Sequence, residues 1–329
     1  MPLISVVIPV YNGEKTIRET LESLLNQTFT DFEALVINDG SKDATLDVVS
    51  SFKDSRIKVF SYPNSGPSAS RNRGIALSSG EYVSFLDADD LWTPDKLEAQ
   101  LQALQAYPEA VLAYSWTDFI NESNQFLRRG SYINVTGDVY KHLLLTDFLE
   151  NGSNPLVRKQ ALVEVGVFDE SLTHGEDWDL WLRLAAKYHF VAVPSAQILY
   201  RVYASSSSAN VPKMETGSLS VLNRAFSQAP SLEYLKPICL ANLYKYLTFK
   251  IMQGLPVRPK SLIAARYLWN AVKNDPSLLQ KHAIRPVLLK IAIAVFLPHR
   301  IVLRLFTQDN IRMLTNVDDL LMCVQLEPF

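Results

Sequence analysis

The sequence is poor in the features that mark several common classes of protein. It has two cysteines, Cys239 and Cys323, in 329 residues, and their spacing fits neither a disulfide framework nor a metal site. No uninterrupted apolar run reaches the ~20 residues of a bilayer-spanning helix; the longest, 287–297, is interrupted by Lys290 and stops at Pro298. The formal net charge of −2 gives no basic character for nucleic acid. We therefore expect a reduced, cytoplasmic protein that does not bind nucleic acid.

Glycine-rich phosphate loops are also missing. The first predicted strand, 3–8, leads into Pro9-Val10-Tyr11-Asn12-Gly13-Glu14-Lys15. This segment contains neither the G-x-G-x-x-G of a dinucleotide-binding dehydrogenase nor the glycine- and arginine-rich loop of a nucleotidyltransferase. The chain enters this strand without a basic, cleavable leader, so we expect no signal peptide.

Strands and helices alternate through the first hundred residues. Apolar runs predict strands at 3–8, 33–37, 57–60 and 82–86. Amphipathic or turn-bounded helices separate them, as in the Ile17, Leu21, Leu24 pattern. Repeated βα units predict a mostly parallel sheet with helices on its faces. Ligands bind beyond the carboxyl ends of such strands, where Tyr11 and Asp39 fall.

Three carboxylates follow the strand at 82–86. Side chains alternate along extended chain, so Asp87 and Asp89 leave it on the same side. Two such oxygen donors suit a divalent ion that also binds phosphate. The alternative is that these acids cap the next helix. Thr93 with Pro94 is the better helix start, so we favour the ion.

The texture of the sequence changes along the chain. Residues 108–210 are less regular, with a helix pattern near 176–184 and strands expected at 190–193 and 198–203. From about residue 214 only helices are predicted, with breaks near three prolines. We predict a catalytic domain at 1–210, composed of halves 1–107 and 108–210, and a helical region at 211–329.

Five motifs now resemble family 2 glycosyltransferases, in the order of that family. They are Ser5-Val6-Val7-Ile8-Pro9-Val10-Tyr11-Asn12, Asn38-Asp39-Gly40-Ser41, Ala69-Ser70-Arg71-Asn72-Arg73-Gly74, Asp87-Ala88-Asp89-Asp90 and Gly175-Glu176-Asp177-Trp178. The resemblance covers roughly residues 1–205. It implies the α/β GT-A fold, Rossmann-like, and transfer with inversion from a nucleotide sugar to a glycan or glycolipid.

The resemblance also implies roles for single residues. Pro9, Tyr11, Glu14, Asp39, Arg71, Asp87, Ala88 and Asp89 would bind the nucleotide sugar, with Asp39 accepting a hydrogen bond from the base, uracil. Asp87 and Asp89 would hold Mn²⁺ or Mg²⁺. Asp177 would be the catalytic base. Asn154, Glu176 and Trp178 are the candidates for acceptor contacts.

Alternatives remain open at two of these positions. Asp177 begins a predicted helix, where a carboxylate also serves as an N-terminal cap. Trp178 lies on an amphipathic helix and is equally explained as core. Two positions depart from the family pattern. Tyr203 stands where many relatives have a metal-binding histidine, so water replaces that ligand or the ion is held less tightly, and Asn38 stands where aspartate is common.

The C-terminal third carries a different signal. Residues 285–306 combine aliphatic residues with cations such as Arg285 and Arg304, on two helices joined at Pro298. This pattern predicts peripheral contact with the cytoplasmic face of a membrane; the alternative is a helical cap packed on the protein. The alternative function is a catalytically degenerate sugar-nucleotide-binding or membrane scaffold protein of the same fold.

Overall fold

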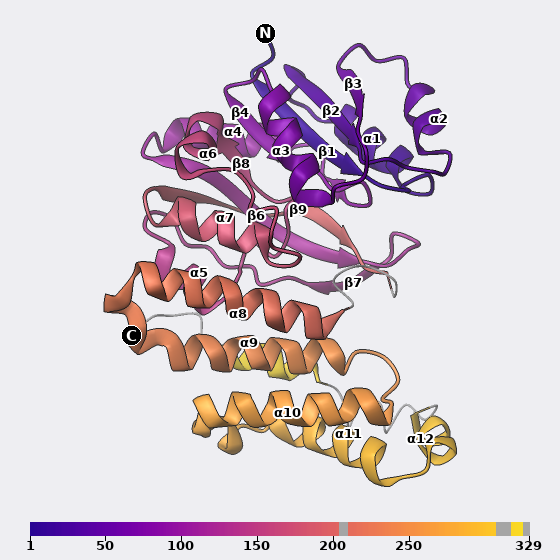
Figure 1. Cartoon of the computed structure of the whole chain (residues 1–329), viewed down its shortest axis with the longest axis vertical. Helices are drawn as coiled ribbons and strands as arrows, with labels where there is room; N and C mark the ends of the chain where they lie inside the picture. Colours follow the sequence, from indigo (N-terminus) through magenta and orange to yellow (C-terminus); the bar gives the residue numbers. More distant parts are fainter. Residues whose placement is uncertain (204–209, 307–316, 325–329) are drawn as a thin grey trace. The chain divides into compact units, whose positions relative to one another are not determined.

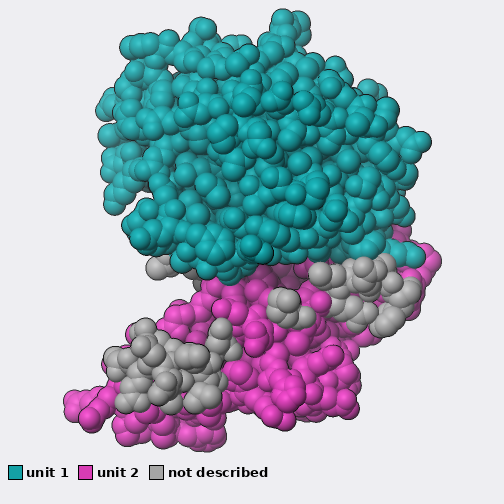
Figure 2. Space-filling view, turned by 180° about the vertical axis from the view of Figure 1, so that it is seen from behind, with its two compact units in different colours: residues 1–143, 147–204 teal, residues 144–146, 205–329 magenta. Residues whose placement is uncertain are grey.

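The chain divides into two compact units. The computed structural model describes residues 1–203, 210–306 and 317–324. One unit contains Met1–Leu143 and Asp147–Ala204, and the other contains Leu144–Thr146 and Ser205–Phe329 (Figure 2). The sequence placed the boundary at residue 210. The two units are described separately below.

A parallel array forms the first half of the large unit (Figure 1). Its strands, in spatial order, are β3 (Ile57–Ser61), β2 (Phe32–Asn38), β1 (Ile4–Val10) and β4 (Tyr82–Phe85). The helices between them are α1 (Ile17–Leu25), α2 (Thr45–Ser50) and α3 (Pro67–Leu77). All three pairings in this array are parallel. The central strands are buried on both faces, as helices on both sides of a sheet require. The predicted βα alternation is confirmed.

The second half of the sheet is mixed. From β4 the order continues through β8 (Leu156–Arg158), β6 (Ala110–Ile120), β9 (His189–Arg201) and β5 (Leu91–Trp92), while β7 (Phe126–Arg129) pairs with β6. Only β6 and β9 are parallel here. The accompanying helices are α4 (Lys96–Ala106), α5 (Tyr140–Leu145), α6 (Lys159–Val165) and α7 (Glu176–Ala185). The α/β class is confirmed.

Two predicted boundaries were wrong. The strands expected at 190–193 and 198–203 are one strand, β9, which ends at Arg201. The pairing register shifts between Tyr114 and Trp116 of β6, and the exposed Pro194 lies among the extra β9 residues opposite this shift, so the strand continues past the proline. The helix expected from Thr93 begins at Lys96. The preceding residues pair with β9 instead, and the Thr93 N–H donates to the Gln197 carbonyl at 3.0 Å.

The second unit contains only helices within its described residues. They are α8 (Val211–Gln228), η2 (Pro230–Leu235), α9 (Lys236–Ile251), α10 (Arg258–Asn274), η3 (Pro276–Gln280), α11 (Ile284–Phe296), α12 (His299–Phe306) and η4 (Asp318–Cys323). The predicted break at Pro298 is confirmed. Lys290, however, is buried rather than part of a basic surface, and its Nζ donates to the Met252 carbonyl at 2.8 Å. Across the described ranges, no helix has the length and apolarity to cross a bilayer.

Candidate active site

Three strand ends meet at the carboxyl edge of the parallel array. β1 lies between β2 and β4, with Val10 opposite Asn38 and Val7 opposite Phe85. The Asp39 N–H donates to the Val10 carbonyl at 2.8 Å, one residue beyond β2. The segment after β4 therefore leaves the sheet on the other side of β1 from Asp39.

The loops after β1 and β2 are joined by hydrogen bonds. The Asn12 N–H donates to Ser41 Oγ at 2.9 Å, and the Lys42 N–H donates to Asn12 Oδ1 at 2.8 Å. The Gly13 N–H donates to Thr45 Oγ1 at 2.8 Å. These contacts fix both loops against each other beside the strand ends.

The predicted nucleoside residues divide between this loop pair and the surface. Tyr11 is 50% exposed, and Pro9 is partly buried within β1. The Glu14 carboxylate accepts the Ala44 N–H at 3.0 Å, so it holds the start of α2. Of the two residues with rings, Tyr11 is the more exposed.

Asp39 is buried, and its orientation is fixed by the loop after β3. Oδ1 accepts the Ser65 N–H at 2.9 Å, and Oδ2 accepts the Gly66 N–H at 2.8 Å. The Arg73 guanidinium lies 3.4 Å from Oδ1. Oδ1 thus has two donors and Oδ2 has one, so the second lone pair of Oδ2 can accept a hydrogen bond from a ligand.

A hydrogen-bond chain shapes the turn formed by residues 87–90, called the acidic turn below. The Asp87 N–H donates to Ser153 Oγ at 3.0 Å, and that hydroxyl donates to Asp90 Oδ2 at 2.6 Å. Asp90 Oδ1 accepts the Arg201 backbone N–H at 3.0 Å. Burial, followed by the charges of the two other acids, raises the pKa of Asp90 well above its ordinary value. Asp90 is thus the acid that organises the turn, a role the sequence did not indicate.

The two remaining acids fit an ion that arrives with phosphate. Burial, and then the negative charge of Asp87, raises the pKa of Asp89 to about 6, so a nearby cation would favour its ionised form. Within the described residues, no three or more His, Cys, Asp or Glu side chains form a metal-binding group. Mg²⁺ commonly takes one or two carboxylates and completes its shell with water and substrate phosphate. Asp87 and Asp89 match that donor set, with Ala88 partly buried between them.

Tyr203 lies within the electrostatic field of Asp89. Burial raises the pKa of Tyr203 to about 12; Arg201 opposes this shift and Asp89 adds to it. The phenol is therefore protonated at neutral pH and is a weak ligand for a hard cation.

Arg71 joins the acidic turn to α7. Its Nη2 donates to Asp87 Oδ1 at 2.7 Å and its Nη1 donates to Glu176 Oε1 at 3.2 Å. Burial alone would lower the pKa of this guanidinium, but the charges of Asp87, Glu176 and Asp177 outweigh burial and raise it. One buried cation therefore faces carboxylates from two elements more than 80 residues apart in the chain.

Two glycines allow Arg71 this position. A Cβ at Gly74 would lie 2.2 Å from Val7 Cγ1, so only glycine lets α3 pack this closely on β1. A Cβ at Gly152 would lie 3.2 Å from Arg71 Nη2. The guanidinium is thereby packed between a helix and the 151–154 loop.

Asp177 lies in the first turn of α7. Gly175, with φ +77°, precedes the helix as its N-terminal cap residue, and Asp177 Oδ1 accepts the Trp178 N–H at 2.8 Å. Burial and then the charge of Glu176 raise the pKa of Asp177 to about 6, against the opposing effect of Arg71. A base with that pKa is largely ionised at neutral pH and still binds a proton appreciably. Its role as catalytic base stays a prediction.

Two of the predicted acceptor residues are committed inside the fold. The Asn154 amide donates to the Ser115 carbonyl at 2.7 Å and accepts the Ser115 N–H at 2.9 Å, with 1% of the residue exposed. Trp178 is 6% exposed, and its Nε1 donates to the Leu143 carbonyl at 2.8 Å. We therefore leave both out of the acceptor site, and Glu176 remains.

Sequence reasoning also missed Asp147. This partly buried acid lies in the loop after α5, and its pKa is raised well above the ordinary value by burial and then by the charges of Asp177 and Glu150. Nothing in the local sequence signals this, because the partners come together only through the tertiary fold. For Ser153, which bonds Asp87 and Asp90, the only signal in the sequence was its place in the polar segment 151–155.

Comparisons of the sequence with known proteins identify the family. The sequence profile described as "Glycosyltransferase like family 2" matches residues 5–251. An uncharacterized glycosyltransferase of Rickettsia typhi is 35% identical over 204 residues, which are 59% of this chain and 64% of that protein. One from Methanocaldococcus jannaschii is 30% identical over 207 residues, covering 61% of this chain and 71% of that protein. One from Rickettsia bellii is 35% identical over 187 residues, covering 56% of this chain but only 26% of that protein.

Solved structures show the same fold. The crystal structure of S. aureus TarS 1-349 in complex with UDP has a TM-score of 0.54 at 20% identity, covering 84% of this chain and 91% of that chain. The complex of the same protein with UDP-GlcNAc has a TM-score of 0.55 at 21% identity, covering 95% and 90%. The matching profile spans most of the chain, and the predicted GT-A fold is confirmed. The chain belongs to the glycosyltransferase-like family 2.

Proposed function

We propose that the protein is an inverting transferase that moves a hexosyl or N-acetylhexosaminyl group from a UDP-sugar to a hydroxyl of a glycan or lipid-linked acceptor. The observation that carries this proposal is the Arg71 cluster. One buried guanidinium bonds Asp87 at the acidic turn and Glu176 on α7, beside Asp177. The candidate donor site and the candidate base therefore belong to one electrostatic unit.

Each part of the cluster has a chemical task in this proposal. Asp39 orients the base of the nucleotide, and Asp87 with Asp89 would hold Mn²⁺ or Mg²⁺. That ion, when bound, supplies Lewis-acid neutralisation of the diphosphate leaving group. Arg71 holds the Asp87 carboxylate in place and keeps Asp177 ionised.

Asp177 supplies the base for a single displacement. It takes the proton of the acceptor hydroxyl as that oxygen bonds the anomeric carbon, and the bond from this carbon to the diphosphate breaks, releasing UDP. One displacement inverts the configuration at the anomeric carbon. General-base catalysis of this kind contributes about 10²–10⁴-fold.

Sugar transfer by variants tests the assignment. With a UDP-sugar panel and Mn²⁺, Asp89→Ala should abolish transfer and hydrolysis, and Asp177→Asn should lower turnover by about 10²–10⁴-fold while sparing UDP binding. Asp138→Asn is the matched control, since Asp138 also accepts a first-turn N–H, from Tyr140 at 3.1 Å, at an exposed helix start. Loss of both binding and turnover in Asp177→Asn would mean a capping role. UDP-sugar binding without turnover in the wild type would favour the degenerate binder.

We also propose that α11 and α12 contact a membrane surface, where a lipid-linked acceptor would lie. Residues 276–306 contain no Asp or Glu and five Lys or Arg, all of them exposed except Lys290. Leu288, Phe296 and Ile301 are exposed by 48%, 82% and 47%. Apolar side chains among cations favour anionic lipid.

Vesicle co-sedimentation checks this contact. Phe296→Ser should reduce binding to vesicles containing phosphatidylserine, and neutral vesicles should bind less than anionic ones. Phe126→Ser is the control, because Phe126 is 60% exposed in the other unit. Equal sedimentation of all three proteins would refute the membrane contact.

A further inference from the structure

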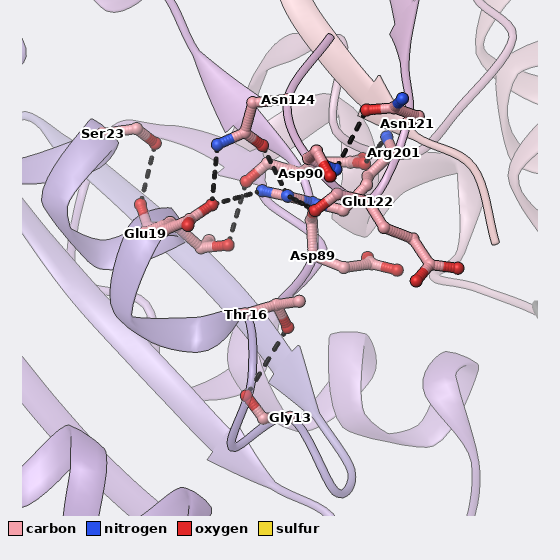
Figure 3. A network of polar contacts seen from close by, with 12 residues as sticks. Gly13, Thr16, Glu19, Ser23, Asp89, Asp90, Asn121, Glu122, Asn124 and Arg201 are labelled. Carbon is pink, nitrogen blue, oxygen red and sulfur yellow. Dashed lines mark hydrogen bonds and ion pairs between the residues drawn. The ribbon is translucent and has the colours of Figure 1, made fainter.

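Arg201, the last residue of β9, connects three separate segments with one buried side chain (Figure 3). Its Nε donates to the Asp89 carbonyl at 2.8 Å. Its Nη2 bonds Glu19 Oε2 on α1 at 2.8 Å. Its Nη1 donates to Asn124 Oδ1 at 2.5 Å and to the Glu122 carbonyl at 3.4 Å, both in the turn between β6 and β7.

The acidic turn, residues 87–90, is also held by Thr20 and Ser153. Thr20 Oγ1 on α1 donates to the Asp90 carbonyl at 3.0 Å, and Ser153 Oγ bonds Asp90 Oδ2. Both contacts are to Asp90, and the Asp87 N–H donates to the same Ser153 hydroxyl at 3.0 Å. The contact from Arg201 Nε is the one among these that holds the backbone of Asp89 itself.

We infer that Arg201 is a positioning residue for the divalent ion, acting through the Asp89 backbone. This inference rests on the proposed function. The chain offers the ion two carboxylates, and Tyr203 is a poor third ligand. When few protein ligands are available, the orientation of each one has a large effect on affinity. β9 therefore contributes to the ion site two residues before Tyr203, by holding a ligand in place.

The turn between β6 and β7 belongs to this arrangement. Asn124 has φ +61° and also donates to Glu19 Oε2 at 3.2 Å. Glu19, Asn124 and Arg201 thus form a closed triangle of hydrogen bonds. Loosening the turn should therefore let Arg201 shift and weaken ion binding without any change in the carboxylates.

Calorimetric UDP titrations with and without Mn²⁺ test the inference. Arg201→Lys should weaken Mn²⁺-dependent UDP binding by about 10–100-fold and leave UDP binding without metal unchanged. Mn²⁺ binding followed by electron paramagnetic resonance should fall by the same factor. Asn124→Gly keeps the left-handed backbone and should give a smaller loss in the same direction. It also serves if Arg201→Lys does not fold.

Arg158→Lys is the matched control. Arg158 also bonds backbone carbonyls of this unit, Ala110 at 3.2 Å and Leu104 at 3.2 Å, but it pairs with the opposite end of β4. The Arg158→Lys variant should be less stable than the wild type, but its UDP binding should depend on Mn²⁺ as in the wild type. If wild-type UDP binding ignores Mn²⁺, the proposed ion site itself fails. If the wild type depends on Mn²⁺ and both Arg201→Lys and Asn124→Gly keep that dependence in full, only the role of Arg201 is refuted.

Discussion

Replacing Arg71 with methionine perturbs the cluster at its centre. The side chain of Arg71 is 6% exposed, and those of Asp87 and Glu176 are 26% and 15% exposed. Removing one partner of a buried ion pair costs about 3–5 kcal/mol. Because Asp87 is partly hydrated, we expect the lower end, about 3 kcal/mol.

Tryptophan fluorescence in urea can measure this loss in the large unit alone. Four of the five tryptophans lie in that unit, and Trp269, 67% exposed, lies in the other. A Trp269→Phe background therefore makes the signal specific. In the same variant the pKa of Asp177 should rise above about 6, because a neighbouring cation that favours its ionised form is gone. The acid limb of the kcat/KM profile should move to higher pH.

A double-mutant cycle decides whether the ion pair is the cause. Arg71→Met with Glu176→Gln removes both the cation and one of its carboxylates. The double variant should be more stable than the sum of the two single effects predicts. Additivity within about 0.5 kcal/mol would refute the reasoning, as would an unchanged pH profile in Arg71→Met.

Three further predictions concern other parts of the same unit. Gly74→Ala should destabilise it by about 1–3 kcal/mol in urea, and Val7→Ala in the same chain should restore part of that loss; no rescue would contradict the packing argument. Burial opposes ionisation of Glu33, but hydrogen bonds from Lys58, Ser79 and Ser5 lower its pKa to about 2. The ionised Glu33 therefore contributes about 3 kcal/mol to the free energy of unfolding. This contribution is present above pH ~4.5 and is lost as the pH falls towards 2. Glu33→Gln should remove this acid-dependent part of the unfolding free energy, and an unchanged pH dependence would refute it. With Asp177 as base, kcat/KM should fall about tenfold per pH unit below about 6, and a flat profile would exclude that role.

The sequence predicted the meeting of strand ends because that outcome follows from repeated βα units alone. Tyr11 and Asp39 come directly after a strand and Asp87 comes two residues after β4, and parallel strands bring their carboxyl ends to one edge. The start of α4 could not be predicted this way. Thr93 and Pro94 favour a helix locally, but the residues before them pair with β9, and tertiary pairing overrides local preference.

The long-range hydrogen bonds and ion pairs within the site could not be predicted from the sequence either. Arg71 and Glu176 are 105 residues apart, and Arg201 and Glu19 are 182 apart, so no spacing rule connects them. Asn154 is part of a polar loop that sequence alone would place at the surface. Its burial depends on Ser115 of β6 offering both a donor and an acceptor.

The hydrogen bonds between the loops after β1 and β2 affect how a nucleotide would bind. They form when the chain folds, so the conformational entropy of these residues, about 1–2 kcal/mol each for the backbone, is lost before any ligand arrives. The proposed nucleoside site is therefore preorganised. Association there should not wait for loop closure, and discrimination between bases should depend on the fixed shape around Asp39.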